Sequence, residues 1–135
     1  MTAAEASAML SEHYAVRDAE LDLLDTERDD TYRVKTPTGT FVLKVAHPDD
    51  DPLYVNLQTA AMSFAGEDAT LPLQRLVLSV DGEIEPVVDG RVVRLLTWLE
   101  GTPLHLVRPT ADELEALGST LGALSAALAS FDHPA

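Results

Sequence analysis

The sequence has 135 residues, 46% of them hydrophobic, a size and composition that suit one domain with its own core. Its 9 Lys and Arg residues are outnumbered by 23 Asp and Glu residues, and a net charge of −14 disfavours nucleic acids and anionic membrane surfaces as partners. The absence of cysteine excludes disulfides, thiolate zinc sites and a cysteine nucleophile. The N-terminus lacks the basic region of a secretory signal, so we expect a cytoplasmic protein.

The first part of the chain predicts a helix followed by three strands. An alanine-rich segment at 2–13 favours the helix, and loosely alternating apolar residues favour a strand at 19–25. A polar turn follows at 26–31. Residues 31–46 alternate apolar and polar side chains on both sides of a Pro-Thr-Gly turn, and this pattern predicts a β-hairpin.

The middle of the chain predicts a helix and three more strands. Residues 47–52 predict a loop. They contain a histidine and then a run of aspartates with a proline at each end, a composition that disfavours regular structure. Apolar residues at helical spacing predict an amphipathic helix at 53–65, which Gly66 ends. Asp-Gly turns separate the later strands. These strands are expected at 73–80, 84–88 and 91–99.

The last part of the chain predicts a linker and a long helix. The linker, 100–109, contains one glycine and two prolines. A capping box of Thr110 and Glu113 starts the helix, which should run over 110–130 with one stripe of leucines. Strands joined by tight turns, with helices between them, indicate an α+β fold built on an antiparallel sheet of about five to six strands.

Lys44 is the residue that most suggests chemistry. It follows the apolar run Phe41–Leu43 in a strand, so its stem can lie on the core while its ammonium points into a cleft. A kinase lysine in this setting binds the phosphates of ATP as a point charge. Alternation alone would place Lys44 on an exposed face. The hairpin before it, the helix after it and the hinge-like segment 94–101 favour a cleft.

The chain resembles the N-terminal lobe of the aminoglycoside phosphotransferase and choline kinase family, which has a protein-kinase-like fold. It is most similar to hydroxylysine kinase-like proteins, and in some bacterial proteins such a domain precedes a class III aminotransferase. The resemblance covers residues 15–134 and rests on the order of its segments. These are TERDDTYRV, FVLKV, LQTAAM, RLVLSVDGE, VRLLTWLEGTPL and ASFDHP. It implies a nucleotide-binding lobe at 1–99, and a hinge linker with the first helix of a truncated second lobe at 100–135.

At the phosphate end, the resemblance makes Lys44 the phosphate-binding lysine and lays the 26–31 turn over the phosphates. This turn has no glycine, and its acidic residues would weaken triphosphate binding unless they point away. The resemblance also makes Gln58 the helix partner of Lys44, at a position where the family has a glutamate. An amide can accept a hydrogen bond from Lys44 but cannot neutralise it, and Gln58 could equally face solvent.

At the adenine end, the resemblance gives two groups of residues. Val34 and Val42 would line the adenine pocket, with Leu96 at its back. The hinge would be formed by Thr97, Trp98 and Leu99. The Thr97 carbonyl and the Leu99 amide would bond the edge of the adenine.

The residues that transfer the phosphate are absent. The family keeps its catalytic Asp and its metal-binding Asn and Asp in the C-terminal lobe, in H-x-D-x-x-x-x-N and D-x-D patterns. His47 and Asp49 begin such a pattern, but Tyr54 stands at the Asn position. We therefore expect no catalytic residue and no metal ligand in this chain. It would be the ATP-binding fragment of a phosphotransferase acting on a small hydroxyl compound, such as an amino alcohol, a hydroxy amino acid or an aminoglycoside.

The resemblance also implies cofactors and partners. ATP and Mg²⁺ would serve the complete domain, and the small-molecule substrate would be bound by the missing lobe. Further domains of a parent protein and a second copy of the chain are other expected partners, the latter through the leucine-lined flank. The alternative function is a small acidic binding module such as a dimeric secretion chaperone. Such a chaperone has no need of Lys44 beside a hinge-like segment.

Overall fold

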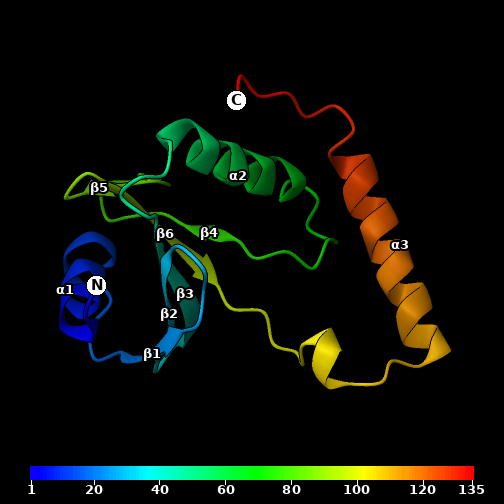
Figure 1. The fold of residues 1–135 in the computed structure, drawn as a ribbon, viewed down its shortest axis with the longest axis horizontal. Helices are drawn as coiled ribbons and strands as arrows, with labels where there is room; N and C mark the ends of the chain where they lie inside the picture. The colour runs from blue at the N-terminus through cyan, green and yellow to red at the C-terminus, as the bar shows by residue number, and fades with distance from the viewer.

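The computed structural model describes residues 1–135, and a six-stranded antiparallel sheet forms its centre. The strands lie in the order β1-β2-β3-β6-β4, and the short β5 also pairs with β6 (Figure 1). The elements, in chain order, are α1 (Ala3–Tyr14), β1 (Glu20–Leu24), β2 (Asp30–Thr36), β3 (Gly39–Val45), α2 (Pro52–Ala65), β4 (Leu76–Val77), β5 (Val87–Val88), β6 (Arg91–Thr97), a 3-10 turn (Leu104–Leu106) and α3 (Ala111–Ala127). The α+β fold class and the expected order of elements are confirmed.

Two predicted strands and one helix are shorter than expected. The 73–80 strand is only β4, because Ser79 turns away and its amide donates to the carbonyl of Glu83. The 84–88 strand is only β5, since Pro86 has no N–H to give to a ladder. The helix predicted to reach residue 130 ends at Ala127, after which the backbone makes tighter turns.

The main core lies between α1 and one face of the sheet. Side chains from β2, β3 and β6 alternate, and those on this face pack against Ala6, Leu10 and Tyr14 of the helix. The strand residues of this core are Tyr32, Val34, Leu43, Val45, Val93 and Leu95. Helix α2 covers the other face, where Gln58 bonds a side chain of β6. Figure 1 shows the two helices on different sides of the strands.

Arg91 ties three strands together at one end of the sheet. Its guanidinium donates to the carbonyls of Ala46 and Val45 and lies 2.7 Å from Oδ2 of Asp30 on β2. Burial alone would raise the pKa of Asp30, but hydrogen bonds from Arg91 and from the N-terminal ammonium outweigh burial and hold this pKa below its ordinary value.

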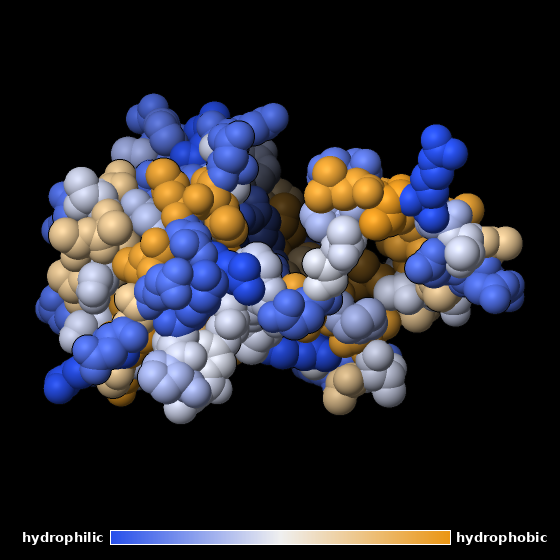
Figure 2. Space-filling view, turned by 90° about the horizontal axis from the view of Figure 1, so that it is seen from below, coloured by the Kyte–Doolittle hydropathy of each residue, from blue (hydrophilic) through white to orange (hydrophobic).

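The last helix stands apart from the sheet. No residue of α3 is buried, and Leu114, Leu117 and Leu121 are 40–54% exposed. Its end approaches α2, where Phe131 and Phe64 lie with ring centroids 5.5 Å apart. Figure 2 shows apolar side chains gathered over the part of the molecule that holds α3 and the residues before it. None of the helices has the length and apolar character that crossing a bilayer would take.

The first prediction concerns the core that α1 completes. Leu10→Ala should lower the free energy of unfolding by about 2–5 kcal/mol, because it leaves a cavity among fully buried side chains. Leu23→Ala removes the same atoms from a side chain that is 65% exposed and is the matched control. Urea unfolding followed by circular dichroism measures both. Equal effects of the two variants would mean that α1 does not pack on the sheet as described.

The second prediction concerns acid. Because the folded-state pKa of Asp30 is depressed, its contribution to stability is present above the unfolded pKa of about 3.9 and is lost as pH falls through the folded value. Asp30→Asn should therefore destabilise the protein by about 1 kcal/mol at neutral pH, with the difference from wild type shrinking below about pH 4. Asp18→Asn, at an exposed position, is the control. Unfolding curves at several pH values test this prediction. A difference in unfolding free energy between Asp30→Asn and wild type that does not depend on pH would contradict it.

Candidate functional site

Lys44 lies in β3, on the sheet face opposite α1. The register places Thr31 of β2 on one side of it and Arg94 of β6 on the other. Its ammonium is 3.0 Å from Oδ2 of Asp29, in the turn between β1 and β2, and about a third of the side chain is exposed (32%). Lys44 is therefore held in an ion pair under this turn and does not extend into bulk solvent.

Arg94 is the second cation of this site, and it is nearly inaccessible, with 3% of its side chain exposed. Its guanidinium donates to Oε1 of Gln58 at 3.1 Å and lies 3.8 Å from Oδ2 of Asp29. Its Nε has no hydrogen-bond partner. Burial lowers the pKa of Arg94, and the carboxylates of Asp29, Glu85 and Asp50 partly offset this effect.

The partner expected for Lys44 differs in the structure. Gln58 bonds Arg94, while Lys44 pairs with Asp29. The reason is one of geometry and charge. Arg94 offers Gln58 a guanidinium donor, and the ammonium gains more from a carboxylate than from a neutral amide. The acidic residues of the turn do not all point away from Lys44, since Asp29 points at it.

Val34 does not lie beside Lys44, which corrects its expected place in the adenine pocket. Because Thr31 pairs with Lys44, the residues of β2 on the same face include Thr31, Arg33 and Lys35, whereas Val34 is fully buried against α1. Arg33 lies across from Val42, and its guanidinium carbon is 4.5 Å from the ring centroid of Trp98. This is the distance of a cation–π contact.

Val42 and Leu96 do share the face of Lys44. They are cross-strand partners two pairs along from Lys44 and Arg94, which makes them the next pair on this face of the sheet. Both are buried, at 6% and 2% exposure, so the apolar floor next to Lys44 is covered in this structure. A flat ligand that uses this floor has to move the side chains above it, and the Arg33 side chain lies in the adjacent position on β2.

The expected hinge begins with Thr97, the last residue of β6, and continues into the segment after this strand. Thr97 bonds the segment before β4: its amide donates to the carbonyl of Arg75, and its carbonyl accepts from Nε2 of Gln74 at 3.1 Å. The Trp98 amide donates to the carbonyl of Thr40, and Leu99 is 47% exposed. The Thr97 carbonyl thus has one lone pair engaged and one left for a ligand.

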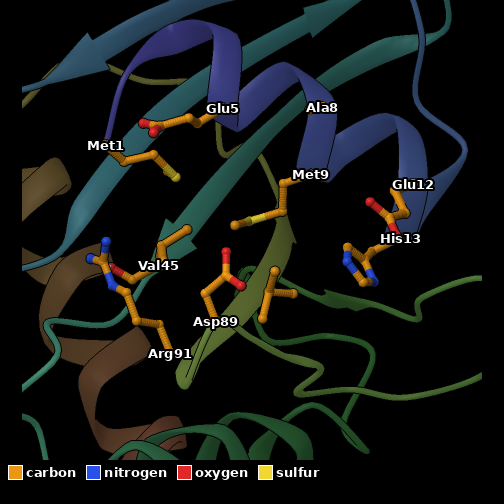
Figure 3. A pocket seen from close by; sticks show the side chains of 10 residues that line it. Met1, Glu5, Ala8, Met9, Glu12, His13, Val45, Asp89 and Arg91 are labelled. Atoms are coloured by element: carbon orange, nitrogen blue, oxygen red, sulfur yellow. The ribbon is translucent and has the colours of Figure 1, made fainter.

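Two large cavities lie on different sides of the sheet. One, of about 480 Å³, is lined by Asp29, the aspartates of the loop after β3 and residues of α2, including Gln58. It adjoins the group formed by Lys44, Asp29 and Arg94, and the ion pair of Arg28 with Asp50 lies along it. The other, of about 490 Å³, lies under α1 (Figure 3). That figure shows Met9 of α1 above Asp89 of the β5–β6 turn, with His13 further along the helix.

The structure brings together no group of three or more His, Asp or Glu side chains that could hold a metal ion. The aspartates after β3 make local contacts instead: Asp51 caps α2 and Asp50 pairs with Arg28. A magnesium ion therefore finds no ready set of ligands among these side chains.

The sequence did not predict the part that three residues play in this site, namely Arg94, Arg33 and Asp29. No local sequence pattern marked Arg94 as part of the site. It lies beside Lys44 because β3 and β6 pair with each other, and these two strands are at least 46 residues apart in the sequence. Arg33 had a signal in the strand alternation, which places it on the opposite face from Val34.

Solved structures of three kinases are similar to this chain. An aminopropanol kinase associated with a microcompartment matches with a TM-score of 0.74 and 20% identity, over 98% of this chain and 42% of the other. A spectinomycin phosphotransferase, in complex with ADP and spectinomycin, matches with a TM-score of 0.70 and 11% identity, over 91% and 37%. An amicoumacin kinase, in complex with AMP-PNP and Ca²⁺, matches with a TM-score of 0.78 and 12% identity, over 100% and 42%.

At these identities the likeness shows the fold, which is that of a protein-kinase-like N-terminal lobe. The chain spans less than half the length of each of the three structures. No curated protein matches the sequence. The closer resemblance to hydroxylysine kinase-like proteins therefore stays a prediction. The findings do not favour the alternative of a secretion chaperone.

The model of the APH phosphotransferase enzyme family matches residues 22–135. The match includes every strand from β2 onward and both later helices, and leaves out only α1 and the first residues of β1. Because it extends over most of the sequence, this chain belongs to the phosphotransferase enzyme family.

Proposed function

We propose that this chain is the ATP-binding part of a small-molecule phosphotransferase that phosphorylates a hydroxyl group. The observation that carries the proposal is the placement of Lys44. It lies on an inner strand beside a second cation and next to an apolar floor, and the neighbouring strand runs directly into the hinge. The kinase neighbours support it, since two of them hold ADP or AMP-PNP.

The side chains of this face fit the two ends of ATP. Lys44 and Arg94 offer two positive charges to the phosphates, within a protein whose net charge is −14. Val42 and Leu96 offer an apolar surface to the purine, with Trp98 at its margin. Arg33 stacks on Trp98 without the ligand, so the purine enters as this guanidinium moves aside.

Each residue has a definite part in binding. Lys44 attracts the phosphates as a point charge and orients them on β3. Gln58 fixes the guanidinium of Arg94 and leaves its charge available, because a neutral amide does not cancel it. The hinge residues Thr97, Trp98 and Leu99 hold the adenine edge through the Thr97 carbonyl and the Leu99 amide. Magnesium, when bound, neutralises charge on the phosphates.

The remaining chemistry belongs to a second lobe in this proposal. Residues 1–99 form the nucleotide-binding lobe, and residues 100–135 form the hinge linker and the first helix of a C-terminal lobe. That lobe supplies the base for the acceptor hydroxyl, the metal ligands and the substrate site. The exposed leucines of α3 would then pack against it. The proposed acceptor has both an amine and a hydroxyl group, as in an aminopropanol, and such a compound fits the phosphotransferase family. The proposed enzyme is cytoplasmic.

The third prediction concerns the lysine. Lys44→Ala should weaken ATP binding at least tenfold, because the phosphates lose one of two nearby cations. Calorimetric titration measures the affinity, and the emission of Trp98, the single tryptophan, reports whether its stack with Arg33 is displaced. Both measurements use the 135-residue chain.

Lys35→Ala is the matched control for this experiment. Lys35 pairs with Glu20 and Asp22 across β1 and β2, so its loss removes the same charge at a distance from the proposed site. Its variant should bind ATP as the wild type does. Equal affinities of Lys44→Ala and wild type, or equal losses in both lysine variants, would contradict the proposed function.

A further inference from the structure

We propose that Asp29 is a displaceable counter-ion of a two-cation phosphate site formed by Lys44 and Arg94. Nucleotide binding would then exchange one carboxylate for the phosphate chain, and the turn between β1 and β2 would leave the cations as the ligand arrives. This inference deepens the proposed function and rests on it.

The geometry centres on one oxygen atom. Oδ2 of Asp29 lies 3.0 Å from Nζ of Lys44 and 3.8 Å from a terminal nitrogen of Arg94. The two positive side chains therefore share this carboxylate, while Glu85 and Asp50 add further negative charge near Arg94. Nε of Arg94 is buried and has no hydrogen-bond partner, so the cluster has a donor unused in this state.

The two cations lie on paired strands, whereas the anion lies on a turn. Lys44, the second-last residue of β3, and Arg94, in the middle of β6, are cross-strand partners held by the pairing of the strands and, for Arg94, by Gln58. Asp29 belongs to a turn of no regular structure. Outside the cluster, the turn is held by bonds from Thr26 Oγ1 to the Asp29 carbonyl and to Oγ1 of Thr31, and by the pair of Arg28 with Asp50.

These turn contacts are easy to break. The Arg28 side chain is 61% exposed, and exposed ion pairs contribute little because solvent screens them. A polyphosphate carries more negative charge than one carboxylate and can contact both cations through different oxygens. The exchange therefore favours a ligand with several phosphates. A single phosphate gains little over Asp29, so Asp29 selects for longer phosphate chains.

The experiment separates phosphate exchange from adenine binding by using two probes, ATP and inorganic triphosphate. Both are titrated calorimetrically into the full chain and into Asp29→Asn. Asp29→Asn should bind each probe at least tenfold more tightly than wild type, because the phosphates no longer compete with a carboxylate. The gain should be at least as large for AMP and inorganic phosphate, because a single phosphate displaces the carboxylate of the wild type less well. Asp29→Ser serves as a second variant if Asp29→Asn folds poorly.

Glu27→Gln is the matched control. It removes one negative charge from the same turn, at an exposed residue that makes no ion pair. An equal gain in Glu27→Gln and Asp29→Asn would overturn the inference, since relief of general repulsion would then explain both. Weaker binding in Asp29→Asn would also overturn it, by showing that the carboxylate assists the ligand. Adding Arg94→Met to Asp29→Asn should reverse most of the gain, and an unchanged gain would remove Arg94 from the site.

The two proposals fail in different ways. If triphosphate shows the tightening and ATP binds no better than triphosphate, the counter-ion exchange stands and the proposed ATP function fails. If wild type binds ATP through Lys44 while Asp29→Asn gives no gain with either probe, the proposed function stands and the exchange fails. If no variant binds either probe, both are wrong.

Discussion

The register of β3 between β2 and β6 is the constraint on which the whole site depends. It sets Lys44 beside Arg94 and Val42 beside Leu96 on one face, and gives Leu43 and Val45 to the core under α1. A slip of one residue would bury the ammonium in that core and expose the leucine. The apolar face under α1 thus holds the charged face in position.

The burial of Arg94 follows from this arrangement and has an energetic cost. A guanidinium that is 3% exposed must recover its lost hydration from neighbouring groups. Gln58 returns one hydrogen bond, and Asp29 returns a nearby negative charge. The carboxylate of Asp29 comes from a turn, whereas the amide of Gln58 comes from a helix. Asp29 can therefore move away from Arg94 more readily than Gln58 can.

Much of the fold could be predicted from local patterns. The hairpin of β2 and β3 followed from alternation around a tight turn, and α2 and α3 from apolar spacing and their caps. Strands at 73–80 and 84–88 were also expected, but the shortness of β4 and β5 could not be predicted, because a strand is defined by its partner and apolar residues such as Leu78 and Val80 stay exposed. For the site, Lys44 stood out by its apolar surroundings, whereas the face on which Val34 lies was misjudged.

The sequence alone determined the elements, the family likeness and the lysine, because each of these is encoded by residues close together in the chain. Only the tertiary structure decided which groups surround the lysine and which of them pairs with it. Asp29 and Gln58 lie 15 and 14 residues from Lys44, and Arg94 lies 50 residues away. Whether such groups meet depends on strand register and on the docking of α2, both of which are set by the packing of the entire sheet.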